Sequence, residues 1–156
     1  MRIATTRFGP LEVPDEGVLS FPEGLIGFEA CTRFAVVGRQ EGRPVWWLQS
    51  LDAPEVAFIL TDPATVVPQY APTLQPSDLE ELGLASADQA EVHVMLVVPR
   101  DPKEITANLL GPLVINPGKR LGKQVVLHNS GYSPAHRLVQ ATVAGAREGT
   151  GEGGGR

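Results

Sequence analysis

Hydrophobic and polar residues alternate with a period of two along much of this chain. The clearest run is 91–98, where Val92, Val94, Leu96 and Val98 share one side of an extended segment. Such alternation predicts a strand with that side turned toward the core. Shorter runs of the same kind occur at residues 33–38, 45–51, 56–61 and 124–128. The pattern therefore predicts many short strands.

Breaks in the pattern mark the expected turns. Residues 105–116 are apolar, but Gly111-Pro112 interrupts them, which predicts a bent strand or two short ones. Residues 39–44 have the length of a hairpin loop between two strands. Residues 116–119 read Asn-Pro-Gly-Lys, which predicts a tight turn with a positive φ at Gly118.

A helix is predicted just before the 91–98 strand. Ser77 and Glu80 have the spacing of a capping box, and Gly83 can end the helix in the left-handed conformation. Residues 86–89 repeat the signal more weakly, so we expect one or two short helices. The predicted fold is mainly all-β, a compact antiparallel barrel or rolled sheet with this helical insert.

The length and composition indicate one domain. The chain has 156 residues, with 17 glycines and 14 prolines that imply frequent turns. Six of residues 145–156 are glycine and none is large and apolar, so this end cannot bury enough surface to fold. We therefore predict a single domain over residues 1–138 and a disordered tail over 139–156.

Charge and cysteine content limit the function classes. The formal net charge is −5, which disfavours direct binding of nucleic acid but suits a basic protein partner. Cys31 is the sole cysteine, which favours a reducing compartment. The sequence shows no signal-peptide pattern and no apolar run long enough to cross a bilayer. A cytoplasmic protein that does not bind membranes is expected.

Candidate catalytic chemistry is sparse. There is no Gly-x-Ser-x-Gly nucleophile motif, and Cys31 has no histidine near it in sequence. His93 and His128 lie in different predicted strands and could hold a metal with a carboxylate, although no ligand spacing supports this over unrelated histidines. We therefore expect that the protein is not an enzyme and that it binds no cofactor. A small-ligand-binding β-barrel or a metal-dependent hydrolase using His93 and His128 is the alternative.

Two further features bear on binding. Trp46 and Trp47 point to opposite faces of a strand, so one belongs to the core and the other is either a protein-binding anchor or covered by a loop. Asn108 interrupts an apolar run and is expected to satisfy backbone groups near the Gly111-Pro112 break.

Several strings, in a fixed order, carry a resemblance to a known family. They are FPEGLIGFE at 21–29, LQSLD at 48–52, PEVAF at 54–58, ITANLLGPLVINP at 105–117 and GKQVVL at 122–127. Together they resemble the bacterial flagellar assembly factor family FliW from about residue 2 to 136. One departure is Ile26, where that family commonly has proline.

The resemblance implies a non-enzymatic partner switch in the cytoplasm. Proteins of this family bind flagellin and the RNA-binding translational repressor CsrA. Flagellin that accumulates in the cell occupies the factor and leaves CsrA free to repress flagellin translation. Export of flagellin releases the factor, which then binds CsrA at a site away from the RNA-binding surface of CsrA. Such a switch is expected to be a monomer, whereas a structural subunit would form a stable homo-oligomer.

The expected contact residues combine exposed acid, rigid proline and an adjacent apolar edge. For the repressor they are the 99–105 loop and the turn at 62–63; for flagellin, an apolar groove that includes a tryptophan is expected. The candidate protein-binding residues are Asp62, Pro63, Asp101, Pro102, Glu104, Ile105, Trp46 and Trp47.

Overall fold

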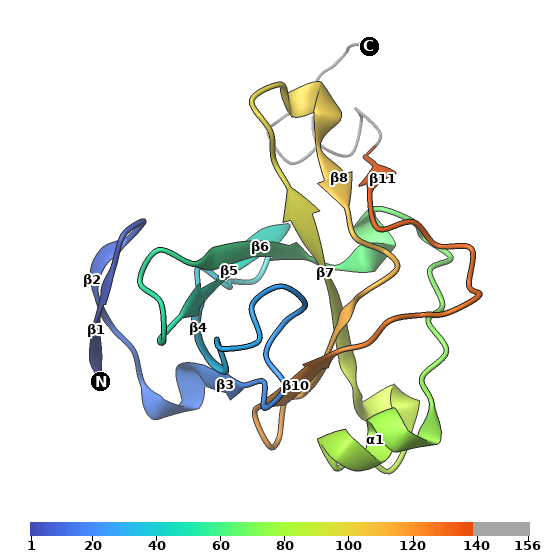
Figure 1. Cartoon of the computed structure of the whole chain (residues 1–156), viewed down its shortest axis with the longest axis horizontal. Helices are drawn as coiled ribbons and strands as arrows, with labels where there is room; N and C mark the ends of the chain where they lie inside the picture. Colours follow the sequence, from blue (N-terminus) through green and yellow to red (C-terminus); the bar gives the residue numbers. More distant parts are fainter. Residues whose placement is uncertain (139–156) are drawn as a thin grey trace.

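A nine-stranded sheet and a separate two-stranded hairpin form most of the structure, a computed structural model that describes residues 1–138 (Figure 1). The predicted tail at 139–156 lies outside the described residues. The strands are β1 Arg2–Thr5, β2 Gly9–Glu12, β3 Val18–Ser20, β4 Arg33–Val37, β5 Val45–Ser50, β6 Ala57–Thr61, β7 Glu91–Val97, β8 Thr106–Ala107, β9 Leu113–Asn116, β10 Leu121–Gln124 and β11 His136–Arg137. The helices are α1 Pro76–Leu82 and the 3₁₀ turns η1 Asp15–Gly17, η2 Pro63–Thr65, η3 Ala87–Gln89 and η4 Pro102–Glu104.

Seven of the strands close into a barrel. They follow the order β7-β6-β5-β4-β3-β10-β9, and β9 pairs back onto β7. The predicted mainly β fold with one or two short helices is therefore confirmed, and residues 1–138 contain a single short α-helix, α1. The β3–β10 pair is parallel, with Leu121 opposite Ser20, whereas an antiparallel sheet was expected. No hairpin joins these two strands, so no tight turn forces them to run in opposite directions.

The strand directions give the barrel two ends that carry different loops. Segments 21–32, 51–56 and 98–112 leave or enter the barrel at one end, here called the Ile26 end. Segments 38–44, 62–90 and 117–120 do so at the opposite end, here called the Asp62 end. The helix α1 belongs to the Asp62 end, and β8 and β11 extend beyond the Ile26 end (Figure 1).

The core has one layer inside the barrel and another outside it. The interior cluster is built around Phe21, Phe34, Leu48 and Leu60, all fully buried. Strand β7 is covered on both faces: Met95 packs against the interior cluster, while its neighbours pack against the outer segments. Those neighbours are Val92, Val94 and Leu96, three of the four residues predicted on the core face.

The fourth of these residues, Val98, is half exposed, so its assignment to the core was wrong. Strand β7 ends at Val97, and the pairing of β6 with β7 reaches only Leu96. Residues beyond that point have no sheet neighbour on the β6 side to cover them.

The predicted break at Gly111-Pro112 is confirmed. The apolar stretch forms two short strands, β8 and β9, and Asn108 Oδ1 accepts a hydrogen bond from Gly111 N at 2.9 Å. A strand at 124–128 was wrong, because β10 ends at Gln124. Val125 and Leu127 lie in irregular backbone and are buried against the outer core.

Two details of turn and cap chemistry also differ from the prediction. The positive φ of the β9–β10 turn, 52°, falls on Arg120 instead of Gly118. The helix begins at Pro76, which suits the first helical position, and Gln75 N donates to Asp78 Oδ2 at 3.0 Å. The capping carboxylate is therefore not Glu80. Gly83 ends the helix with a φ of 70°, as predicted.

Candidate functional site

The structure separates the predicted contact residues into two groups. Asp62 follows β6 at the Asp62 end and caps η2, because its Oδ1 accepts from Ala64 N at 2.9 Å. Asp101 lies beyond the Ile26 end and caps η4 in the same way, accepting from Lys103 N at 3.0 Å. Both carboxylates are exposed. The two groups therefore lie at different ends of the barrel.

The apolar members of these groups are less accessible than expected. Ile105 and Pro63 are buried, so neither offers an apolar edge to a partner. Pro102 and Glu104 remain exposed, and the Glu104 carboxylate forms an ion pair with Arg137. The accessible chemistry of the 101–105 segment is consequently charged, and its buried apolar residue anchors η4 to the domain.

Both tryptophans are covered, and they point to opposite faces of β5 as predicted. Trp46 is buried in the interior cluster, with the His93 ring edge-on at 4.8 Å and the Arg39 guanidinium over its face at 4.7 Å. Trp47 is partly buried by the β1–β2 hairpin, where Phe8 packs edge-on at 5.5 Å and Arg7 lies over the ring. Neither is a free aromatic anchor.

A polar cleft of about 470 Å³ opens at the Asp62 end beside the β4–β5 loop. Arg39, Asp62 and His93 contribute to its lining. Glu91 Oε1 lies 3.0 Å from Arg39 Nη2 and 3.2 Å from His93 Nε2, so one carboxylate contacts both groups. The His93 Nδ1 atom is buried and has no hydrogen-bond partner among residues 1–138.

Burial and hydrogen bonds together set the pKa values of this cluster. The His93 pKa is lowered because desolvation disfavours the imidazolium, an effect larger than the opposing hydrogen bond to Glu91. For Glu91, burial tends to raise the pKa, but hydrogen bonds from His93 and Arg39 outweigh it and the pKa is lowered. At neutral pH, His93 is therefore neutral and the Glu91 carboxylate beside it is ionised.

The structure does not support the metal-site alternative. His93 is buried near the start of β7, whereas His128 is exposed and follows the end of β10, at the other end of the barrel. Within residues 1–138, no three His, Cys, Asp or Glu side chains converge as a metal site would require. Cys31 is buried as a free thiol.

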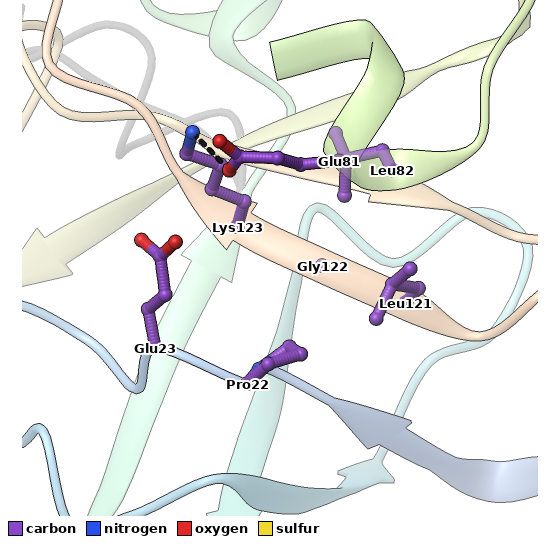
Figure 2. Close-up of a pocket in the computed structure, with 7 residues that line it drawn as sticks. All are labelled: Pro22, Glu23, Glu81, Leu82, Leu121, Gly122 and Lys123. Atoms are coloured by element: carbon purple, nitrogen blue, oxygen red, sulfur yellow. Dashed lines mark hydrogen bonds and ion pairs between the residues drawn. The ribbon is translucent and has the colours of Figure 1, made fainter. Parts of the chain in front are cut away.

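A smaller groove lies between α1, β10 and the segment after β3 (Figure 2). Its volume is about 200 Å³, and it was not predicted from the sequence. Lys123 Nζ lies 2.8 Å from Asp78 Oδ1 and 2.6 Å from Glu81 Oε1. Burial tends to lower the Lys123 pKa, but these two hydrogen bonds outweigh it and the pKa is raised. Its ammonium thus hydrogen-bonds to both carboxylates of α1.

Exposed apolar side chains form a second feature that the sequence did not reveal. Apart from Met1, the exposed large hydrophobic residues all lie at or beyond the Ile26 end; in residues 1–138 they are Ile26, Phe28, Val97, Val98 and Val126. Phe28 packs edge-on against Phe58 at 5.1 Å. Ile26 lies outside the strands, and its backbone N–H donates to Gln124 Oε1 at 2.8 Å. The apolar string at residues 25–28 is visible in the sequence, but whether its side chains are exposed depends on the tertiary arrangement.

No helix in the described part of the chain is both long and apolar enough to cross a membrane.

Comparison with known proteins gives a consistent match over the folded region. The family described as FliW protein matches residues 2–138. The flagellar assembly factor FliW of Natranaerobius thermophilus is 38% identical over 148 residues, which cover 94% of this chain and 98% of that protein. That of Heliobacterium modesticaldum is 37% identical, over 99% of this chain and 100% of its own.

A solved structure extends the match to three dimensions. The crystal structure of the flagellar assembly factor FliW superimposes with a TM-score of 0.80 and 36% identity, covering 88% of this chain and 96% of that one. The sequence motifs, the closed barrel and the near-complete coverage point to the same conclusion. This chain belongs to the FliW family of flagellar assembly factors.

Proposed function

We propose that this protein acts in the cytoplasm as a monomeric partner switch that binds flagellin and antagonises a CsrA-type translational repressor. It does so without catalysis and without a cofactor. Membership of the flagellar assembly factor family is the observation that carries the proposal. The switch would couple flagellin synthesis to flagellin export, because flagellin and the repressor compete for one factor.

The charge of the domain supports capture of the repressor. A net charge of −5 favours encounter with a basic RNA-binding protein and opposes the approach of RNA phosphates to the complex. Thermodynamic linkage requires this antagonism to be mutual. RNA bound to the repressor weakens binding of this protein by the same factor by which this protein weakens RNA binding.

The apolar residues at the Ile26 end support capture of flagellin. An amphipathic helix binds by laying its apolar face on an apolar surface. Trp46 and Trp47 are covered, so the accessible apolar side chains for this purpose are Ile26, Phe28 and Val97. We propose that flagellin contacts this end of the barrel instead of the tryptophans.

The exposed acids of the two predicted groups remain proposed contacts for the repressor. Asp62, Asp101 and Glu104 present carboxylates to solvent. Pro63, Pro102 and Ile105 shape the two turns that carry them. Because the two turns lie at opposite ends of β7, we expect one of them, and not both, to contact a given partner.

A three-component competition tests the proposal. The purified full chain is titrated calorimetrically with cognate flagellin monomer, with cognate CsrA-type dimer, and with the dimer in the presence of saturating flagellin. We expect binding in the first two titrations and loss of repressor binding in the third. Absence of binding to both partners at micromolar concentration would overturn the function. Binding of flagellin alone would leave a chaperone without the regulatory role.

Charge variants then map the repressor contact. Asp62→Lys and Asp101→Lys are compared with Glu55→Lys, which makes the same charge change at an exposed residue of the β5–β6 loop that forms no ion pair within residues 1–138. We expect one aspartate variant to weaken repressor binding by about tenfold more than Glu55→Lys does. Equal effects of all three would show that only net charge matters.

A further inference from the structure

The groove between α1 and β10 has apolar walls. Pro22 forms one side and Leu82 of α1 forms the other, and Leu121 and Gly122 of β10 form the floor (Figure 2). Its volume of about 200 Å³ is below the roughly 300–1,000 Å³ of pockets that enclose a whole small ligand. A space of this size and shape suits a single side chain of a protein partner.

The charges around the groove do not balance. Lys123 is the only cation that lines it in the described structure, and both Asp78 and Glu81 hold its ammonium. Glu23 stands across β10 from Glu81 (Figure 2), is exposed, and forms no ion pair within residues 1–138. Two carboxylates, Glu23 and Glu81, therefore line the groove together with one ammonium, which pairs with Glu81 and leaves the Glu23 charge at the rim without a cation within residues 1–138.

We propose that this groove binds one arginine or lysine side chain of the basic repressor. The aliphatic stem of such a side chain packs on apolar walls while its charged end stays at the rim, where the Glu23 carboxylate receives it. An acidic side chain would be repelled, and a purely apolar one would bury Glu23 without a partner. The inference rests on the proposed function, because the repressor is the basic partner.

The surface next to the groove fits a protein occupant. Ile26 belongs to the same loop as Glu23 and is 61% exposed. Gln124, which follows Lys123 on β10, fixes this loop by accepting a hydrogen bond from Ile26 N and donating one to Gly111 O at 3.0 Å. A rigid apolar residue beside a cation-accepting groove gives a partner segment two adjacent points of contact.

The test uses Glu23 variants of the full chain titrated with cognate CsrA-type dimer. Glu23→Gln removes the charge and Glu23→Lys reverses it, and neither breaks a described contact, so the fold is retained. We expect Kd to rise about threefold for Glu23→Gln and at least about tenfold for Glu23→Lys. Glu55→Lys, with the same change in net charge in the β5–β6 loop and outside the lining of the groove, should raise Kd by less than about threefold.

Other results would overturn the inference in distinguishable ways. Equal weakening by Glu23→Lys and Glu55→Lys would show a general electrostatic effect and no groove contact. Unchanged repressor binding with weaker flagellin binding would assign the groove to flagellin instead. If the wild-type chain bound no repressor at all, the proposed function would fail first, and the groove assignment with it.

Discussion

Asn116 Nδ2 donates a hydrogen bond of 2.8 Å to Leu82 O, and so joins the end of β9 to the last turn of α1. The Oδ1 atom of the same side chain accepts from Gly118 N at 3.1 Å. One buried amide thus satisfies a carbonyl at the helix end and orders the β9–β10 turn. The helix wall of the groove and its β10 floor are held in register by this residue.

Replacing Asn116 with Ala should therefore destabilise the domain. The substitution leaves the Leu82 carbonyl and the Gly118 amide without their partner, at a cost of about 1–3 kcal/mol. Urea unfolding measures the loss. Asn116→Asp keeps the acceptor for Gly118 but places a carboxylate against the Leu82 carbonyl, so it should not restore stability. Wild-type stability in both variants would show that the amide has no structural role.

Gly122 should not tolerate even a methyl group. A Cβ at this position would lie 2.5 Å from Phe21 Cζ, and that ring is fully buried in the interior cluster. Gly122→Ala is expected to lower the free energy of unfolding by about 1–3 kcal/mol through overpacking. The matched control is Gly118→Ala, whose Cβ would meet Asn116 Oδ1 at an ordinary 3.5 Å. Thermal unfolding of the two variants side by side distinguishes crowding from a general effect of losing glycine.

Lys123 should matter to stability chiefly through Asp78. The Asp78 side chain is 9% exposed, and removal of the ammonium leaves its carboxylate buried without a cation. Lys123→Met is expected to cost about 1–3 kcal/mol in urea unfolding at pH 7. Glu81→Gln, which breaks the other pair at a side chain 48% exposed, should cost less than about 1 kcal/mol. A larger loss of stability for Glu81→Gln than for Lys123→Met would mean that the exposed Lys123–Glu81 pair contributes more than the buried Lys123–Asp78 pair.

Acid should destabilise the domain in two steps. The lowered pKa of His93 means that the unfolded chain binds a proton more readily, so stability falls as pH drops below about 6.5 and levels off below the folded-state pKa. The lowered pKa of Glu91 adds a second loss as pH falls below about 4.5. Urea unfolding between about pH 8 and pH 3 follows both steps.

A histidine variant isolates the upper step. His93→Gln should lose the pH dependence near 6 while retaining the lower step, even if its overall stability is reduced. The control is His128→Gln, which changes an exposed side chain and should follow the wild-type profile. A His93→Gln profile that still fell between pH 6.5 and 5 would assign the upper step to another group.

The sequence predicted those parts of the fold that depend on local pattern. Strand β7, the helix before it and the break at Gly111-Pro112 follow from alternation, cap residues and proline chemistry, which act over a few residues. The exposure of Val98 and the parallel β3–β10 pair depend on where distant segments end, and no local pattern encodes that.

In the candidate site, too, some features follow from local sequence and others depend on where distant segments meet. The caps formed by Asp62 and Asp101 could be anticipated, since Asp-Pro sequences favour turns. The burial of Ile105 could not, because η4 turns that side chain inward. The groove was equally invisible, since Glu23, Glu81 and Lys123 are far apart in sequence and meet only when β10 pairs beside β3 and α1 packs on β10.

Closure of the barrel through the β7–β9 pair also limits how this protein can associate. Each barrel strand has neighbours on both sides, so within residues 1–138 unpaired strand edges remain only in short elements such as β11 and the β1–β2 hairpin. Strand addition recognises a partner mainly through its backbone and depends less on sequence. A closed barrel offers that route only at these short edges, so it must recognise partners chiefly by their side chains. Its choice of partner can then change through single surface substitutions while the fold stays the same.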